Sequence, residues 1–561
     1  MSNPTVAEYV LCRLADLGIS HIFGVPGDYS FGINDAVENV PSLRWVACAN
    51  ELNAAYAADG YARVRGAAIL NTTFGVGELS AINGVMGSKA HRLPVFHLVG
   101  SPSERIKYQG LATHHNLGDG DFGRFKPISE SACCVSAELT PDNAIEETER
   151  VIREALRQSM PAYITISELC GRQRVIGVPK MGVPLKEIKR QGSDPEELMA
   201  ALTEITNRLT EARQPVAVVE ALVARYGMAE EAARFISRTN IGFVTTPNGK
   251  GTLDESMPQF LGVYTGEGSW PEGVCDRVEA ADLVLALGGL ANVELNTGAW
   301  STRFDPAKTI TINDRWVQAG GKIFTPVAID DVLRGLVERA QPVPSVPAIQ
   351  PQPPAMVGSP DERLTSANLY PRLQRMLHAG DSLVIETGTC MFHLAKTLLP
   401  RGVESHSQTL WGSIGWGTPA ALGVAMAKTN GRTWLVTGDG SHQLTYNEIA
   451  VMGRYGIKPV ILVLNNGIYG VEYVVAEPVD HPHEYNNLAN VQYHLIPAAM
   501  GCRGWLARRV GTVAELEEAF AAISGHDGGV YLEVMIPPEE SQPEPAAYFN
   551  RQYKLSTPEP A

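Results

Sequence analysis

The chain has 561 residues, of which 44% are hydrophobic and 19% charged, and its formal net charge is −15. This length exceeds that of one ordinary domain, so we expect about three domains, and the composition is that of a soluble globular protein with a large core. The acidic balance argues against nonspecific nucleic-acid binding, because that function requires many lysine and arginine side chains to neutralise phosphates.

Eight cysteines are scattered along the chain, and none belongs to a C-x-x-C pair. This pattern gives no support to a zinc site or a thioredoxin-like site, and it fits a reducing cytosol. The first residues include acidic side chains and lack a basic segment followed by an apolar one, so they do not resemble a signal peptide. No apolar run is long enough to span a bilayer. We therefore expect a cytoplasmic protein with no membrane partner.

The first part of the chain alternates helical and extended patterns. Apolar residues recur at helical spacing before the first strand candidate. Strand candidates occupy residues 21–23, 45–49, 68–74 and 94–99. Because helical stretches separate them, we expect a parallel sheet covered on both faces. We assign residues 1–180 to this first domain.

Two further domains of the same kind are expected, at residues 193–340 and 361–540. Their strand candidates are residues 216–219, 283–287, 309–312, 382–385, 433–437 and 460–464. The proline-rich residues 341–360 resist helix and central strand, so they predict an extended linker. Residues 541–561 form a C-terminal tail rich in proline and glutamate. The expected fold is α/β with three doubly wound parallel-sheet domains, and the first and third are candidates for a shared topology.

Polar clusters follow two predicted strands of the third domain. Gly438-Asp439-Gly440-Ser441 follows one strand, and Asn465-Asn466 follows the next. Open α/β sheets bind ligands at the carboxyl ends of their strands, and glycines let the backbone approach a phosphate closely. Asp439 and Asn466 offer the oxygen ligands that Mg²⁺ prefers. Each cluster alone is a common turn sequence, but the pair at this separation favours a diphosphate and magnesium site.

The two clusters resemble the G-D-G…N-N pattern of thiamine-diphosphate enzymes, and nearly the whole chain resembles their pyruvate and indolepyruvate decarboxylase group. The resemblance implies a pyrimidine-binding domain, a central domain and a diphosphate-binding domain, in that order. It implies that Mg²⁺ is held by Asp439, Asn466 and the backbone carbonyl of Ile468. The other cofactor contacts that it implies are Glu51, Thr387, Gly388, Thr389, Cys390, Gly412, Ile414, Gly438, Gly440, Ser441 and Tyr469.

Glu51 follows a predicted strand and opens a helical stretch. The helix dipole alone favours an acid at this position. By the resemblance, Glu51 hydrogen-bonds the pyrimidine ring of thiamine and promotes formation of the ylid, after which the cofactor acts as an electron sink. The implied reaction is non-oxidative decarboxylation of a 2-keto acid to an aldehyde and CO₂ through this ylid and an enamine.

Four more side chains match the proton-handling set of the family, namely Asp28, His114, His115 and Glu472. Protonation of the enamine carbon and release of the aldehyde need groups that exchange protons near neutral pH. The alternatives are a turn acid for Asp28, a solvated helix residue for Glu472, and a surface loop or a metal site for the histidines. Neighbouring residues of an extended chain point to opposite faces, which argues against joint metal chelation.

By the same resemblance, Met391, Val471 and Val475 line the substrate pocket, where pyruvate-specialised relatives carry bulkier residues. We therefore expect larger branched or aromatic substrates such as phenylpyruvate, indolepyruvate or 2-ketoisovalerate to be favoured. The alternatives are a pyruvate decarboxylase, a carboligase of the acetohydroxyacid synthase type and a non-enzymatic thiamine-diphosphate sensor. The resemblance also implies a homo-oligomer, a dimer or a homotetramer built as a dimer of dimers, since the pyrimidine-binding domain of one subunit faces the diphosphate-binding domain of another.

Overall fold

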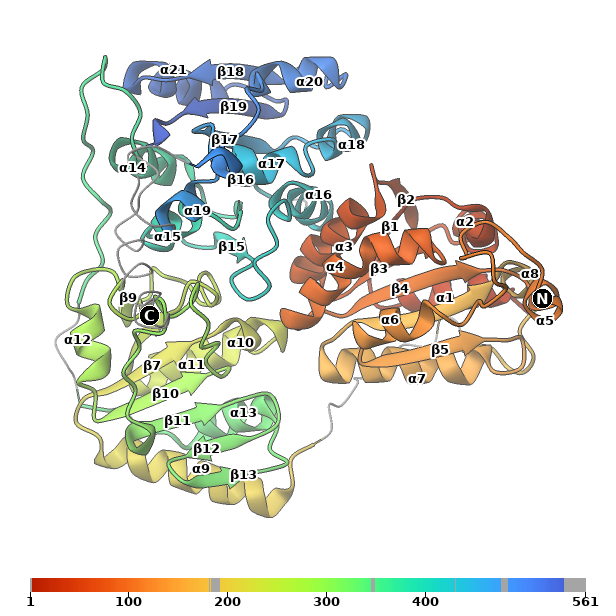
Figure 1. Cartoon of the computed structure of the whole chain (residues 1–561). Coiled ribbons are helices and arrows are strands. Elements are labelled where there is room, and N and C mark those ends of the chain that lie inside the picture. Colours follow the sequence, from red (N-terminus) through yellow and green to blue (C-terminus); the bar gives the residue numbers. More distant parts are fainter. Residues whose placement is uncertain are drawn as a thin grey trace, which may run out of the picture. The chain divides into compact units, whose positions relative to one another are not determined.

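The computed structural model describes residues 3–180, 182, 192–344, 349–428, 430–475 and 483–538. It contains three sheets, each flanked by helices, which confirms the α/β class (Figure 1). The chain divides into two compact units, one comprising residues 1–190, 418–429 and 445–457 and the other the remaining residues. Most of residues 181–191 and the whole predicted tail, residues 541–561, lie outside the described residues.

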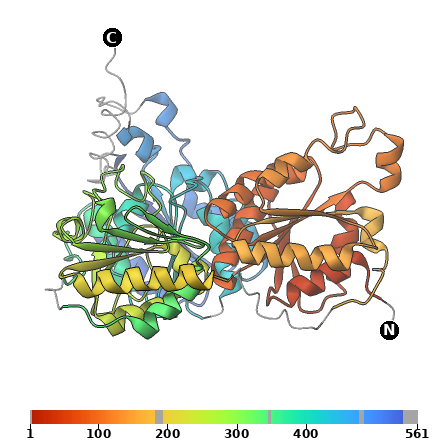
Figure 2. The same ribbon diagram turned by 90° about the horizontal axis from the view of Figure 1, so that it is seen from below.

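The first sheet has six parallel strands in the order β2-β1-β3-β4-β6-β5. Every residue of β3, β4 and β6 is buried, because helices lie on both faces of the sheet (Figure 2). This burial accounts for the continuous apolar runs that predicted the strands. The strands are β1 (His21–Gly24), β2 (Arg44–Ala47), β3 (Ala68–Thr73), β4 (Val95–Ser101), β5 (Val135–Leu139) and β6 (Ala162–Ser167). The helices are α1 (Val6–Ala15), α2 (Phe31–Val37), α3 (Glu51–Arg65), α4 (Val76–Ala90), α5 (Glu104–Gln109), α6 (Lys126–Ser131), α7 (Ala144–Gln158) and α8 (Glu168–Arg172).

The third sheet repeats this topology. Its six parallel strands run in the order β15-β14-β16-β17-β19-β18, which is the order of the first sheet when the strands are numbered along the chain. The strands are β14 (Ser382–Ile385), β15 (Glu404–Ser407), β16 (Thr433–Gly438), β17 (Val460–Asn465), β18 (Leu506–Val510) and β19 (Val530–Met535). The helices are α14 (Ser366–Met376), α15 (Thr389–Ala395), α16 (Gly417–Ala427), α17 (Asp439–Gln443), α18 (Glu448–Arg454), α19 (Gly470–Val475), α20 (Ile496–Ala499) and α21 (Val513–Ile523).

The central sheet departs from the expected all-parallel arrangement. Its order is β13-β12-β11-β10-β7-β8-β9, and β12 and β13 pair antiparallel at one edge. Only Gly320 and Gly321 connect these two strands, and so short a connection makes a hairpin and excludes a parallel crossover. The strands are β7 (Pro215–Val219), β8 (Gly242–Thr245), β9 (Phe260–Val263), β10 (Leu283–Leu287), β11 (Thr309–Ile312), β12 (Val317–Ala319) and β13 (Lys322–Phe324). The helices are α9 (Pro195–Glu211), α10 (Ala221–Arg225), α11 (Ala229–Thr239), α12 (Val274–Glu279) and α13 (Ile329–Arg339).

The remaining segments are short or irregular. Residues 341–344 and 349–359 of the proline-rich segment form no helix or strand, in line with the expected linker. Within the described part of the chain, no helix has the length and apolar character needed to cross a bilayer. Short 3-10 helices occur at η1 (Asp28–Ser30), η2 (Pro306–Lys308), η3 (Glu484–Asn486) and η4 (Tyr493–Leu495).

Candidate active site

A cleft of about 250 Å³ opens where β14, β16 and β17 end. Most residues expected to contact a cofactor line it, together with Leu464 and Gly470, which the sequence analysis missed. Gly470 lies between the expected Tyr469 and Val471, and Leu464 directly precedes the Asn465-Asn466 cluster, so adjacency was the available signal. The expected residues that line the cleft are Thr387, Gly388, Thr389, Cys390, Ile414, Gly438, Asp439, Gly440, Ser441, Asn466, Ile468, Tyr469, Val471 and Glu472.

Asp439 joins the two polar clusters at the floor of this cleft. It begins α17 directly after β16 and is 2% exposed. Its Oδ1 accepts a hydrogen bond from the Gly440 N–H at 2.9 Å, and its Oδ2 accepts one from the Gly467 N–H at 2.8 Å. Burial raises the pKa of Asp439 to about 6, although the backbone N–H groups act in the opposite direction. The side chain is thus a desolvated, pre-oriented oxygen donor, as a magnesium ligand should be.

The turns that flank Asp439 are closely packed. A Cβ atom on Gly440 would lie 2.6 Å from Cε1 of Tyr469, so this position requires glycine. Asn466 Oδ1 accepts a hydrogen bond from the Ile468 N–H at 3.1 Å, which shapes the turn after β17. Ser441 Oγ donates to the Thr387 carbonyl at 3.5 Å and so links the turns after β14 and β16. These contacts make one continuous polar surface from three separate strand ends.

Among the residues expected near this cleft in the third domain, Met391 and Gly412 are not among the described residues that line it. Met391 is buried and lines a neighbouring apolar cavity with Val263, Trp270 and Leu295. Its neighbour Cys390 lines the cleft, because successive side chains of a helix point about 100° apart. Gly412 lies on the same loop as Ile414 but does not line the cleft, and the side chain of Val475 lies outside the described residues.

Glu386 is a buried acid beside the cleft that the sequence analysis missed. It directly follows β14 and is fully buried. Its Oε1 accepts a hydrogen bond from the Thr387 N–H at 3.0 Å, and its Oε2 accepts one from the Gly417 N–H at 2.8 Å. Burial raises the pKa of Glu386 to about 7. Its position after a buried strand, like that of Asp439, was the signal that could have found it.

In the first domain, the structure brings Asp28, His114 and His115 together. His114 Nε2 lies 3.0 Å from Asp28 Oδ2, and the two histidine rings lie 4.4 Å apart between centroids. The chain here is not extended as expected, because His115 has a φ of 63°, which turns both rings to the same side. One ligand atom from each of the three residues lies within 4.8 Å of the others. Both proton transfer and metal binding are therefore geometrically feasible.

The two histidines differ in their surroundings. The His114 side chain is 55% exposed, whereas His115 packs against the rings of Tyr29 and Phe74, each 6.1 Å away between centroids. Burial lowers the pKa of His115, the charge of His114 acts in the same direction, and Asp28 opposes both. The Nδ1 atom of His115 is buried and has no hydrogen-bond partner among the described residues. His115 is thus favoured in its neutral form.

Glu51 and the histidines approach the same glycine turn, residues 75–77. Glu51 opens α3 after the N-cap residue Asn50. A Cβ atom on Gly75, whose φ is +66°, would lie 2.4 Å from the His115 carbonyl oxygen, and one on Gly77 would lie 3.4 Å from Glu51 Oε1. The turn therefore tolerates no side chain at Gly75, where the histidine segment packs on it.

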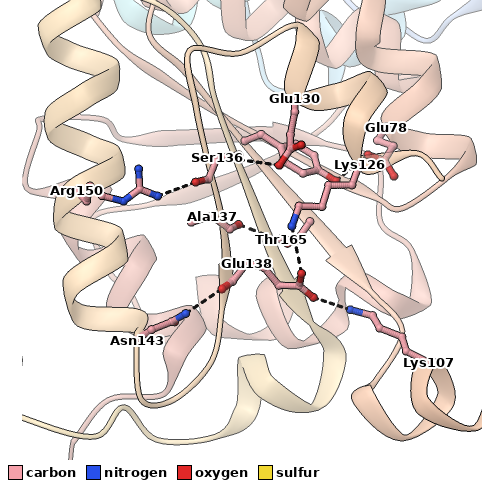
Figure 3. Close-up of polar contacts among 11 residues, drawn as sticks. Glu78, Lys107, Lys126, Glu130, Ser136, Ala137, Glu138, Asn143, Arg150 and Thr165 are labelled. Atoms are coloured by element: carbon pink, nitrogen blue, oxygen red, sulfur yellow. Dashed lines mark hydrogen bonds and ion pairs between the residues drawn. The ribbon is translucent and has the colours of Figure 1, made fainter. Parts of the chain in front are cut away.

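We call residues 110–125, which connect α5 to α6, the histidine loop. Both ends of this loop are tied to one carboxylate on β5 (Figure 3). Glu138 lies 3.1 Å from Lys107 Nζ on α5 and 3.3 Å from Lys126 Nζ on α6. Burial acts to raise the pKa of Glu138, but the two lysines outweigh it and lower this pKa. These half-exposed ion pairs fix where the histidine loop starts and ends.

Three domain families match the chain in order. The N-terminal thiamine pyrophosphate binding domain of thiamine pyrophosphate enzymes matches residues 4–119, the central domain residues 202–330, and the C-terminal thiamine pyrophosphate binding domain residues 386–534. An alpha-keto-acid decarboxylase of Mycobacterium leprae (strain TN) is 38% identical over 99% of this chain and 98% of its own. The chain belongs to the alpha-keto-acid decarboxylase family of thiamine pyrophosphate enzymes.

Other members and solved structures agree with this assignment. The alpha-keto-acid decarboxylase of Mycolicibacterium paratuberculosis (strain ATCC BAA-968 / K-10) is 38% identical over 95% of this chain and 94% of its own. The thiamine diphosphate-dependent 4-hydroxybenzoylformate decarboxylase of Rhodococcus jostii RHA1 shares the fold, with a TM-score of 0.78, 19% identity and coverage of 95% of this chain and 99% of its own. In this thiamine pyrophosphate enzyme, the cleft lies within the segment matched by the C-terminal binding domain, and Glu51 and the histidines lie within the segment matched by the N-terminal one.

Proposed function

We propose that this protein decarboxylates a 2-keto acid to an aldehyde and CO₂, with thiamine diphosphate and Mg²⁺ bound in the cleft. The observation that carries the proposal is the buried Asp439 carboxylate, which joins the Gly440 and Gly467 turns in a chain similar to alpha-keto-acid decarboxylases over its full length. We also propose a role for each of the three assigned domains. Residues 1–180 would bind the pyrimidine ring, residues 193–340 would form the central domain, and residues 361–540 would bind the diphosphate.

The cleft suits the proposed group. Asp439, Asn466 and the Ile468 carbonyl would hold Mg²⁺, since all three supply the hard oxygen donors that this ion prefers. A Cβ atom on Gly438 would meet nothing within 4 Å, so this position leaves room for phosphate oxygens, and the Thr389 and Ser441 hydroxyls supply donors. When bound, the cofactor supplies the electron sink that accepts the electron pair left by departing CO₂.

The chain's own residues would handle the protons. Glu51 would hold a proton at its carboxylate facing the pyrimidine ring. His114, oriented by the contact between its Nε2 and Asp28, would take or give a proton through its imidazole ring. His115, favoured in its neutral form, would accept a proton within this set. Glu472, exposed at the start of α19 and lining the cleft, completes the set.

The test is to incubate the purified protein with thiamine diphosphate, Mg²⁺ and a panel of 2-keto acids and to identify the products. We expect aldehyde and CO₂ in equal amounts, and none after exhaustive removal of metal and cofactor. A carbon–carbon condensation product would favour the acetohydroxyacid synthase alternative, and cofactor binding without turnover would favour the sensor. Rapid-quench analysis of the alanine variants of His114, His115 and Glu472 should show bound intermediates accumulating. Normal turnover in all three variants would remove the proton-handling roles.

For the substrate, we propose larger 2-keto acids, such as phenylpyruvate, indolepyruvate or 2-ketoisovalerate. The support is the apolar cavity beside Met391 and the small Val471 in the cleft lining. Each methylene of fit is worth only about 1 to 3 kcal/mol, so several changes must act together. The test compares kcat/KM for pyruvate, 2-ketoisovalerate and phenylpyruvate in the wild type and in Met391→Trp. A wild type that prefers pyruvate, or a variant that handles phenylpyruvate as well as before, contradicts this proposal.

We also propose a cytoplasmic homo-oligomer, a dimer or a dimer of dimers. All eight cysteines lie in the described residues as free thiols, which fits a reducing compartment. In the proposed oligomer, Glu51 of one subunit serves a cofactor held by Asp439 of another. Mixing inactive Glu51→Gln and Asp439→Ala subunits should then restore part of the activity. A fully active monomer in light scattering contradicts this assembly.

A further inference from the structure

The loop of residues 408–417, here called the Ile414 loop, reaches the cleft without helix or strand of its own before Gly417. It presents Leu410, Trp411 and Ile414, each between 37% and 42% exposed. An irregular loop that displays apolar side chains needs an internal support, because its backbone makes no regular ladder.

Two buried side chains supply that support. Gln408 is fully buried, and its Oε1 accepts a hydrogen bond from the Ser413 N–H at 2.9 Å. Glu386 accepts the Gly417 N–H at 2.8 Å and also bonds the Gly415 N–H. On its other side, Glu386 accepts the Thr387 N–H at 3.0 Å, at the start of the turn that lines the cleft. One carboxylate therefore connects both walls, the turn after β14 and the Ile414 loop.

The contact between Glu386 and the loop is tightly fitted. A Cβ atom on Gly417 would lie 2.9 Å from Glu386 Oε2, so the loop approaches the carboxylate as closely as glycine permits. Glu386 is fully buried and does not line the cleft, so it cannot touch a ligand bound there. Three N–H donors converge on it, and an uncompensated buried N–H group costs about 1 to 3 kcal/mol.

We propose that Glu386 is a positioning residue whose buried carboxylate fixes the Ile414 loop against the end of β14. It thereby sets the cleft wall before any cofactor binds. The effect on the cofactor rests on the proposed function, but the effect on the loop does not.

The test compares Glu386→Gln with a matched control, Glu220→Gln. Glu220 is also a buried acid after a strand, β7 of the central sheet, and it accepts the side chains of Thr246, Asn248 and Asn296. The glutamine side chain in Glu386→Gln has one acceptor oxygen and one NH₂ group, which is a donor. The NH₂ group would therefore face a backbone N–H donor, either that of Thr387 or that of Gly417. The control reports the general cost of neutralising a buried acid.

The first measurement uses ligand-free protein labelled with 5-fluorotryptophan. The ¹⁹F resonance of Trp411, assigned through Trp411→Phe, reports the loop directly. The second measurement is the Kd for thiamine diphosphate in the presence of Mg²⁺. We expect Glu386→Gln to shift or broaden the Trp411 resonance. We also expect it to raise the Kd for thiamine diphosphate at least about tenfold, which corresponds to the loss of about one hydrogen bond. Glu220→Gln should change neither.

An unchanged Trp411 resonance in folded Glu386→Gln, or the same change in the control, overturns the proposal. If Glu386→Gln does not fold, the same measurements are made on Glu386→Asp. This variant keeps both carboxylate oxygens but has a side chain shorter by one methylene. An unchanged Trp411 resonance in Glu386→Asp would likewise overturn the proposal. Absence of thiamine diphosphate binding in the wild type would overturn the proposed function instead, and the Trp411 resonance would still decide the role of Glu386.

Discussion

The cleft at the ends of β14, β16 and β17 and the histidine loop are held in place by opposite means. At the cleft, Asp439, which lines it, and Glu386, which lies beside it, are 2% and 0% exposed, and backbone N–H groups donate to both carboxyl groups. At the histidine loop, the Glu138 side chain is 49% exposed and holds two lysines, and the side chains of Asp28 and His114 are about half exposed. One region is fixed by buried hydrogen bonds and the other by ion pairs at the surface.

The difference shows how a single chain can combine a rigidly fixed cleft with a loop that is held by weaker, adjustable contacts. Buried hydrogen bonds are screened little by salt. Exposed ion pairs are worth about 0 to 1 kcal/mol each and weaken as ionic strength rises. Holding a diphosphate and a metal requires fixed geometry, whereas side chains that exchange protons with a substrate and then release a product benefit from some freedom.

The largest effect confined to the cleft is expected for Asp439→Ala. We expect activity to vanish and the Kd for Mg²⁺ with thiamine diphosphate to weaken by more than about a hundredfold, since loss of even an indirect metal contact can cost that much. Isothermal titration measures the affinity. Asp28→Ala, which alters only the histidine side of the comparison, should bind the cofactor normally. Equal loss of affinity in both variants would mean that the two regions are not separate.

Glu51→Gln should do the reverse and spare binding while slowing the reaction. The side chain keeps its shape but can no longer exchange a proton, and such groups are worth about a hundredfold to ten-thousandfold in rate. The measurement is deuterium exchange at the reactive carbon of the bound thiamine ring, together with the Kd. Exchange at the wild-type rate would contradict the role of Glu51.

The buried carboxylate of the cleft should also produce a pH-dependent stability. Burial raises the pKa of Glu386 from 4.5 to about 7, so the fold favours its protonated form. Its stabilising contribution is therefore complete below pH 4.5 and is lost as the pH rises through 7, by about 3 kcal/mol for a shift of this size. Denaturant unfolding at several pH values, compared between the wild type and Glu386→Gln, should show this loss only in the wild type. The same pH dependence of the unfolding free energy in the wild type and in Glu386→Gln would contradict this prediction.

The smallest effect belongs to the ion pairs of the histidine loop. Glu138→Gln should cost at most about 1 kcal/mol, and less at high salt, because both lysine contacts are half-exposed. Amide hydrogen exchange of residues 110–125 should accelerate in the variant at low salt and converge with the wild type at high salt. The control is Glu154→Gln, which removes the partly buried pair with Arg157 on α7 and should leave the loop unchanged. An effect that persists at high salt would mean that Glu138 acts through packing.

The sequence predicts the fold better than it predicts the environment of single residues. The strand candidates at residues 216–219 and 283–287 became β7 and β10, because continuous apolar runs reflect burial on both faces of a sheet. The antiparallel hairpin β12–β13 was missed because its strands have three residues each. Three residues are too few to show the hydrophobic pattern of a strand. The linked strand ends of the cleft were predictable because loops at the carboxyl edge of a parallel sheet must converge.

Side-chain direction was harder to predict. The positive φ of His115 reverses the expected placement of the two histidines, and no local residue pattern announces it. Met391 faces a neighbouring cavity and Cys390 the cleft, a choice that depends on how α15 is rotated. Glu386 and Glu138 carry no motif, since what makes them important is the distant residues that they contact. Such contacts are tertiary properties and are not encoded in spacing along the chain.

The shared strand order of the first and third sheets has a consequence for the ancestry of the site. In each sheet two glycines flank the first residue of the helix that follows the third strand, in Gly75-Val76-Gly77 after β3 and in Gly438-Asp439-Gly440 at the end of β16. Duplication of one ancestral unit leaves this kind of equivalence, with one copy bearing an acid between its glycines and the other a valine. The proposed diphosphate and metal site and the proposed proton-handling site would then be paralogous positions that diverged after such a duplication.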